Sequence, residues 1–348
     1  MSETTFDFDL LRELTEERGV PGYEDRVRDV VRRELEETTD SVTTDAMGNV
    51  VGTLEGESDY SVAVAAHMDE IGFMVRNVTK EGFLQLDALG GWDPRVLRAQ
   101  RVTVHTEGGD LTGIIGSPAP HGGSDDDEPD VHDVHVDMGL AVDAVEERVS
   151  VGDLVTMDQT TVRVGDLVTG KSLDDRVCVF QMLEAARRIE TPPVTIHFCA
   201  TVQEEIGLRG AQALGVDVDP DLAVALDVTV ANDVPDAEDG EEVTELGDGA
   251  AIKLKDSSVV TNPKVNRRMR SVADDEEIPY QLEVLPSGGT DTAGFQNTFG
   301  AKPVGAISIP TRYLHTVTES AHVDDVAAAI DLLVAVLETE TGEEDYTL

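Results

Sequence analysis

Three apolar segments that each carry or precede a charged or metal-binding residue constrain the fold of this chain most strongly. They cover residues 61–66, 193–201 and 222–230. Such continuous runs are typical of strands that are buried on both faces of a sheet. His67 follows the first segment, Glu204 follows the second, and Asp227 lies inside the third. Because a buried charge is unfavourable without a cation or hydrogen-bond donors, these positions are candidates for a functional site.

Amphipathic helices are predicted around these strands. Residues 24–37 place Val27, Val30, Val31 and Leu35 on one helical face. Further helices are predicted over residues 6–18, 176–189, 262–274 and 323–338. Further strands are predicted over residues 49–53, 280–285 and 304–309. The alternation of strands and helices predicts an α/β fold, with a central mixed β-sheet flanked by helices.

The stretch between residues 70 and 164 has a different texture. Short strand-like runs separated by glycine-rich turns follow one another at residues 71–76, 82–86, 101–106 and 111–115. This pattern predicts a small β-barrel-like (PDZ-like) domain over residues 70–164. We expect it to be inserted into a catalytic domain formed by residues 1–69 and 165–348. The acidic run 125–128 within it is expected to be solvated surface.

The charge of the chain restricts its partners and its environment. Asp and Glu number 71 against 26 Lys and Arg, which gives a formal net charge of -45. Phosphates would be repelled, so nucleic acid and anionic membrane surfaces are not expected as partners. Disorder is not expected either, because 40% of the residues are apolar and fall in periodic runs. The charge instead predicts a surface adapted to concentrated salt, and therefore a halophilic source. The polar N-terminus and the lack of long apolar runs predict a cytoplasmic protein.

Five short segments contain the residue types that bind divalent cations. They include His67-x-Asp69, Asp174-Asp175, Glu204-Glu205, Asp227 and His315. Each alone also fits a structural role, such as a polar strand end or a helix cap. Together they supply two histidines and several acids, which suit zinc, cobalt or manganese, near the strand ends where α/β sites gather. A two-metal site needs a bridging carboxylate and a spare one as general base, and the two adjacent glutamates can provide one ligand and one base.

The order of these segments resembles the TET aminopeptidases, which belong to the glutamyl aminopeptidase family of co-catalytic metallopeptidases, often labelled endoglucanases. The motifs that carry the resemblance are His-x-Asp, Leu-Asp-Asp-Arg, Glu-Glu-x-Gly, a single Asp and Arg-Tyr-x-His. It extends over nearly the whole chain, including residues 45–49, the pair Gly90-Gly91, residues 288–291 and the inserted domain.

The resemblance implies a role for each matching residue. His67 and Asp227 would hold one metal ion, and Glu205 and His315 would hold the other. Asp174 would bind both ions. Glu204 would be the general base, and Asp69 would orient His67. A cis peptide bond would follow Asp174. The resemblance also implies two divalent ions, with zinc preferred to cobalt or manganese. It implies peptide substrates with a free N-terminus and a hollow homo-dodecamer built from dimers.

The substrate pocket and two other functions are less constrained by the sequence. Gly289, Thr290 and Asp291 are candidates for substrate binding, although a glycine turn with Asp291 capping the next helix explains them too. Paired carboxylates also hydrolyse sugars, so a glycosidase is an alternative, but carbohydrate sites are usually rich in aromatic residues and Trp92 is the only tryptophan. A non-catalytic chaperone or scaffold is a further alternative. The presence of every expected metal ligand and of the general base argues against it.

Overall fold

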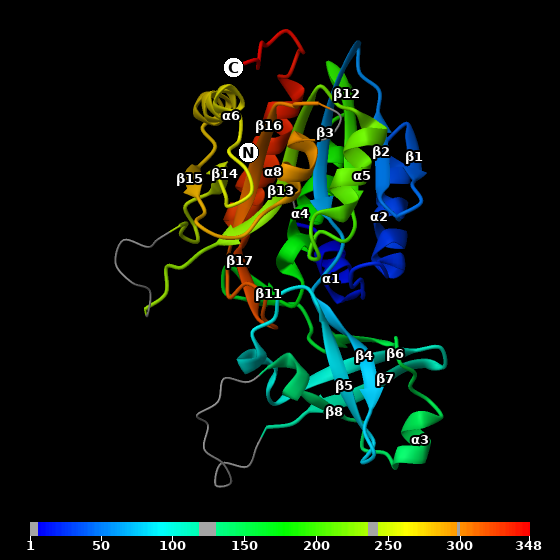
Figure 1. Cartoon of the computed structure of the whole chain (residues 1–348). Helices are drawn as coiled ribbons and strands as arrows, with labels where there is room; N and C mark the ends of the chain where they lie inside the picture. Colours follow the sequence, from blue (N-terminus) through cyan, green and yellow to red (C-terminus); the bar gives the residue numbers. More distant parts are fainter. Residues whose placement is uncertain (1–5, 118–129, 236–242, 298–299) are drawn as a thin grey trace.

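The predicted α/β fold is confirmed. The computed structural model describes residues 6–117, 130–235, 243–297 and 300–348, so the acidic run 125–128 lies outside the described residues. A large mixed sheet flanked by helices forms one body, and a smaller barrel lies beyond one end of it (Figure 1). No helix among the described residues is long and apolar enough to cross a bilayer.

The large sheet has eleven strands, in the order β1-β2-β12-β3-β13-β16-β17-β11-β10; β14 also pairs with β16, and β15 pairs with β14. Its strands are β1 (Ser41–Thr44), β2 (Val50–Leu54), β3 (Ser58–His67), β10 (Val162–Val164), β11 (Leu167–Gly170), β12 (Val194–Thr201), β13 (Leu222–Val230), β14 (Ala250–Lys255), β15 (Tyr280–Val284), β16 (Val304–Arg312) and β17 (Glu319–His322). The central neighbours β12, β3, β13 and β16 run parallel, so their carboxyl ends lie at one edge.

The helices cover both faces of this sheet. They are α1 (Phe8–Glu16), α2 (Asp25–Thr38), α4 (Leu173–Arg188), α5 (Arg209–Val218), α6 (Pro263–Asp275), α7 (Asp291–Gln296) and α8 (Val323–Glu338), whereas α3 (Val142–Glu146) lies with the barrel and buries Val145 in its core (Figure 1). On one face α4 and α8 pack over the core that contains Val64 and Leu226. On the other face α5 and α7 pack over Ala63 and Ala223. Successive residues of a strand therefore enter two different cores, which explains why the central strands are apolar at consecutive positions.

The inserted region forms a closed antiparallel barrel in the order β4-β5-β8-β7-β6-β9. Its strands are β4 (Gly72–Val78), β5 (Phe83–Leu89), β6 (Gln100–Thr106), β7 (Gly109–Ile115), β8 (His135–Asp137) and β9 (Leu154–Met157). The 3₁₀ turns Pro94–Leu97 and Val131–Asp133 lie between these strands. The barrel has its own apolar core, which includes Phe73 and Val104. Strand β10, expected within the insertion, pairs with β11 in the large sheet; the domain division at residues 69/70 and 164/165 stays a prediction.

Local sequence signals explain where several helices begin. Asn262 caps α6 by accepting the N–H groups of Lys264 and Val265, and Pro263 occupies the first turn, where a missing N–H does no harm. The helix predicted from residue 176 instead begins at Leu173, and its first turn departs from helical geometry at Asp174 and Asp175.

Candidate metal centre

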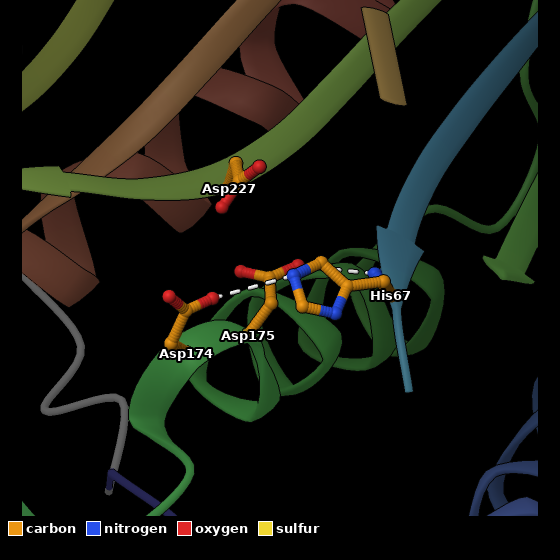
Figure 2. Close-up of side chains that lie close together, drawn as sticks. All are labelled: His67, Asp174, Asp175 and Asp227. Atoms are coloured by element: carbon orange, nitrogen blue, oxygen red, sulfur yellow. Dashed lines mark hydrogen bonds and ion pairs between the residues drawn. The ribbon is translucent and has the colours of Figure 1, made fainter. Parts of the chain in front are cut away.

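The seven predicted metal-binding and catalytic residues converge where the parallel strands end. His67 is the last residue of β3, and Asp227 lies on the neighbouring strand β13; each follows by two residues the last pair between these strands, Ala65 with Ala225. Figure 2 shows both facing Asp174 and Asp175 at the start of α4. A pocket of about 350 Å³ opens at this point. It is lined by His67, Asp174, Glu204, Glu205, Gly207, Leu208, Asp227, Gly288, Gly289 and His315.

Asp174 stands between the two histidines. Its Oδ1 lies 3.3 Å from Nε2 of His67, and its Oδ2 lies 3.3 Å from Nε2 of His315. Asp174 belongs to two groups of potential ligand atoms. Within each group, these atoms all lie within 4.8 Å of one another. One group contains His67, Asp174, Asp175 and Asp227, and the other contains Asp174, Glu205 and His315. A carboxylate whose two oxygens face different histidines has the arrangement of a bridging ligand.

The charges and the unsatisfied atoms of the cluster fit divalent cations. The Oε1 atom of Glu205 is buried, has no hydrogen-bond partner and lies 3.7 Å from Nε2 of His315. With protein groups alone around it, burial and the charge of Asp174 raise the pKa of Glu205 to about 8. Burial and the same neighbour raise the pKa of Asp227 well above its ordinary range. A cation would supply the missing partner and reverse both shifts, because its charge favours the ionised carboxylates.

Histidine titration in the cluster is governed by the same carboxylate. Burial tends to lower the pKa of His315, but the hydrogen bond and charge of Asp174 outweigh it and raise the pKa to about 10. His315 Nδ1 lies 2.7 Å from the backbone oxygen of Gly91, which orients the ring so that Nε2 faces Asp174. Gly91 of the Gly90-Gly91 pair thus contacts the site through its backbone oxygen. Because Nδ1 is engaged in this contact, Nε2 is the nitrogen that remains to bind a cation.

Asp69 holds the loop that carries the two glutamates. Its carboxylate accepts the backbone N–H of Glu204 at 2.9 Å and that of Glu205 at 3.0 Å. Nδ1 of His67 lies 3.0 Å from the backbone oxygen of Asp69 and 3.5 Å from its carboxylate. Asp69 therefore contacts His67 as predicted, and the closer contact is made by its carbonyl oxygen.

The motif at residues 45–49 supports the same loop from the other side. Asn49 accepts the N–H of Val202 with its Oδ1 at 3.0 Å and donates to the carbonyl of Gly210 at 3.2 Å. The carboxylate of Asp45 accepts from the Asn49 side chain at 2.6 Å. The glutamate loop is thereby bound at both of its ends, which limits its freedom to move.

A buried ionic network positions the turn before Asp174. Glu70, fully enclosed at the start of the barrel connection, accepts from Lys171 Nζ at 2.6 Å and from Ser172 Oγ at 2.5 Å. Arg176 is fully buried and donates to the backbone oxygens of α1 and the turn that follows it. The peptide bond between Asp174 and Asp175 is cis, as the resemblance implied.

Sequence reasoning did not assign a role to Asp175. This residue is completely buried, its Oδ2 accepts the backbone N–H of His67 at 3.1 Å, and its Oδ1 has no partner. The sequence shows that Asp174 and Asp175 are adjacent. The role of Asp175 depends on the direction of its side chain, which the sequence does not give.

The predicted substrate residues are only partly at the pocket. Gly289 lines it together with Gly288, whereas Thr290 and Asp291 are buried beside it. Thr290, not Asp291, caps α7 by accepting the N–H of Thr292. Asp291 accepts the hydroxyl of Thr201 at 2.5 Å and keeps its Oδ1 unpartnered.

Comparison with known proteins agrees with this fold and site. A lysyl aminopeptidase of Pyrococcus furiosus is 35% identical over 98% of this chain and 99% of its own. An aminopeptidase structure from the archaeon Desulfurococcus kamchatkensis superposes with a TM-score of 0.93 at 36% identity, covering 96% of this chain and 95% of that one. The Pyrococcus horikoshii TET1 peptidase, described as assembling into a tetrahedron or a large octahedral shell, has a TM-score of 0.86 at 31% identity, over 95% and 99% of the two chains.

A mixed α/β sheet with histidines and carboxylates gathered at its strand ends is the architecture of a metal-dependent hydrolase. The family described as M42 glutamyl aminopeptidase matches residues 48–332. The chain belongs to this family of metal-dependent aminopeptidases.

Proposed function

We propose that the protein removes residues from the free N-terminus of peptides with the help of two divalent cations. Zinc is the proposed native ion, with cobalt or manganese as alternatives. The observation that carries this proposal is the placement of Asp174, whose two oxygens each face a different histidine at 3.3 Å. A carboxylate shared by two cations needs this placement.

The proposed ligand sets follow the two groups of atoms that meet at Asp174. His67 and Asp227 hold one position, Glu205 and His315 hold the other, and Asp174 belongs to both. When bound, a pair of divalent cations lowers the pKa of a water molecule and polarises the carbonyl of a scissile peptide bond.

Glu204 is the proposed general base. It lines the pocket but belongs to neither group of ligand atoms among the described residues. Its carboxylate is therefore free to take a proton from the attacking water and to deliver it to the leaving amine nitrogen. The bond from its own N–H to Asp69 keeps the side chain beside the ligands during both transfers.

The pocket suits the end of a peptide. Its volume of about 350 Å³ lies at the small end of the range for ligand sites, about 300–1,000 Å³. The acids that line it are assigned to the cations and to the general base, so we propose that the free α-amine docks near one cation position, which a blocked terminus could not do. We propose that the turn at Gly289, Thr290 and Asp291 borders the first side chain, with Gly289 nearest to the substrate.

An assay on free and blocked peptides tests this function. We expect release of the first residue from amino-acyl amides and short peptides, tested with glutamyl, lysyl and leucyl N-termini. The same peptides should resist cleavage once acetylated, because an acetyl group turns the basic amine into an amide and adds bulk where the amine would dock. Equal cleavage of acetylated peptides, or activity only on β-linked glucose oligomers, would contradict the proposal.

We also propose that the barrel contributes to a homo-dodecamer built from dimers. Phe83 on β5 and Ile114 on β7 both lie opposite Asp137 on β8, and both side chains are exposed. Leu140, just past β8, is exposed as well. Neighbouring apolar side chains on an outer barrel face are typical of a surface that another subunit covers.

The assembly is expected to depend on salt, because we propose that the protein works in a halophilic cell. A charge of -45 per chain repels between subunits over about 30 Å at 0.01 M salt, but over only about 3 Å at 1 M. Lowering the concentration of potassium chloride should first dissociate the particle and then unfold its subunits. Sedimentation velocity and circular dichroism along one salt series would follow both steps. A particle that stays assembled and folded at about 0.01 M salt would contradict the halophilic reading.

A pair of matched substitutions separates the barrel surface from the general effect of charge. At molar salt, Ile114→Asp should shift the protein toward smaller species, since Ile114 is 54% exposed on the proposed interface. Val216→Asp adds the same charge at a 50% exposed position on α5 and should leave the assembly intact.

A further inference from the structure

Buried carboxylates bind the backbone N–H groups of the residues that form the site. This contact is distinct from the side-chain contacts that define the ligand groups, and it recurs at nearly every member. His67 donates to Asp175, Glu204 and Glu205 donate to Asp69, and Asp174 and His315 donate to Glu319.

Glu319 binds two of these residues and has no role so far. It begins β17 and lies opposite Gly170, the last residue of β11, after which the chain turns toward Asp174. Its Oε2 accepts the N–H of Asp174 at 3.0 Å, and its Oε1 accepts the N–H of His315 at 2.9 Å. Neither oxygen belongs to a group of potential metal ligands among the described residues.

The two residues that Glu319 binds are ligands of the same proposed cation position. Asp174 and His315 come from turns 141 residues apart in the sequence, and each lies four residues from the last pair of the β11–β17 ladder, Gly170 with Glu319. His315 also has a backbone φ of +57°, in the left-handed region that is unfavourable for a residue with a side chain. The bond from its N–H to Glu319 helps to hold that conformation and so the direction of the imidazole ring.

Only a carboxylate can make both bonds with full strength. Two N–H groups point at the side chain of Glu319, and each of its two oxygens accepts one of them. Glutamine has the same shape, but its amide NH₂ would face one of the two donors. The exposed fraction of Glu319 is 2%, so water cannot replace the lost acceptor.

We propose that Glu319 is a positioning residue of the metal centre. By binding both backbone N–H groups, it fixes the separation of Asp174 and His315 that one of the two cation positions requires. This inference rests on the proposed two-cation function. It predicts a larger defect at the position of Glu205 and His315, where Glu319 orients both His315 and Asp174, than at the position of His67 and Asp227, where only Asp174 depends on it.

The test is the metal content of Glu319→Gln. Wild-type and variant protein are equilibrated at a series of free zinc concentrations, and bound zinc is counted by mass spectrometry. We expect the midpoint for the second zinc ion to rise about 10–100-fold, the usual effect of losing a residue that orients a ligand. At high zinc, kcat should return to within a few-fold of the wild-type value, since no group that touches substrate has changed.

Asp325→Asn is the matched control for a loss of stability. Asp325 is fully buried at the start of α8 and accepts the backbone N–H groups of Gly247 and Gly249, both at 2.8 Å. This variant loses the same kind of double acceptor away from the site. It should lower Tm but bind both zinc ions with unchanged midpoints.

Other outcomes separate the inference from the function on which it rests. Unchanged midpoints in Glu319→Gln would overturn the role of Glu319, and so would an equal loss of zinc in Asp325→Asn. If the wild-type protein bound only one ion, the two-cation function would fail instead. Should Glu319→Gln not fold, Glu319→Asp keeps both acceptor oxygens but withdraws them by about 1.5 Å. It should give a smaller shift of the same midpoint, and no shift would likewise overturn the role.

Discussion

Glu204→Gln is expected to lower kcat by about 10²–10⁴-fold while both cations and the fold are retained, the usual scale for removing a general base. Glutamine keeps the shape of the side chain but cannot accept the proton of the attacking water. The loop should stay in place, because the Glu204 N–H bond to Asp69 does not involve the changed side chain. The measurement is kcat on an amino-acyl amide, together with bound metal per subunit.

Glu205→Gln is the matched variant for that experiment. The same chemical change at the next residue removes a buried oxygen that faces His315, so it should weaken binding of one cation. Activity should then recover in part as free metal rises, which it should not do in Glu204→Gln. If Glu204→Gln lost metal and Glu205→Gln kept it, the roles of the two glutamates would be reversed.

Removal of the cations is expected to abolish activity completely, and zinc or cobalt should restore it. The cluster combines two imidazole nitrogens with carboxylate oxygens, a mixture that suits these ions. Magnesium is the control, because it prefers an all-oxygen octahedral site and should not restore the enzyme. Full turnover by protein shown to be free of metal would exclude the metallopeptidase function.

Restoration should also depend on pH. With protein groups alone around them, Glu205 has a pKa of about 8 and His315 a pKa of about 10, so both carry a proton at neutral pH. Cation binding must displace these protons. The half-activating metal concentration should therefore fall as pH rises from about 6 to 8, by about tenfold per pH unit for each displaced proton.

Calorimetric titration of the chelated protein in two buffers with different ionisation enthalpies would count the released protons directly. A half-activating concentration that did not change with pH would contradict the assignment of Glu205 and His315 as ligands.

Elements with a strong local pattern could be predicted from the sequence, and elements without one could not. The predicted helix over residues 323–338 coincides with α8, whose apolar positions repeat at helical spacing. Helix α5 is not predicted, because Gly210 and Gly215 lower its intrinsic preference for a helix although its buried Ala211 and Leu214 follow helical spacing. Strand β14 contains Lys253, which is fully buried against Glu283 of β15. A lysine in a sequence is expected to be exposed, and only the structure shows that Lys253 is buried in an ion pair.

The residue types of the site and their places in the chain could be predicted from local patterns, because strands that run through a core are apolar and because histidines and acids are common ligands of divalent cations. How these residues contact one another depends on the tertiary fold. Asp174 reaches both histidines, and Glu319 holds the backbone of Asp174 and His315, through contacts between segments far apart in the chain. No local pattern encodes such contacts, since they arise when strand pairing brings the separate turns to the same edge of the sheet.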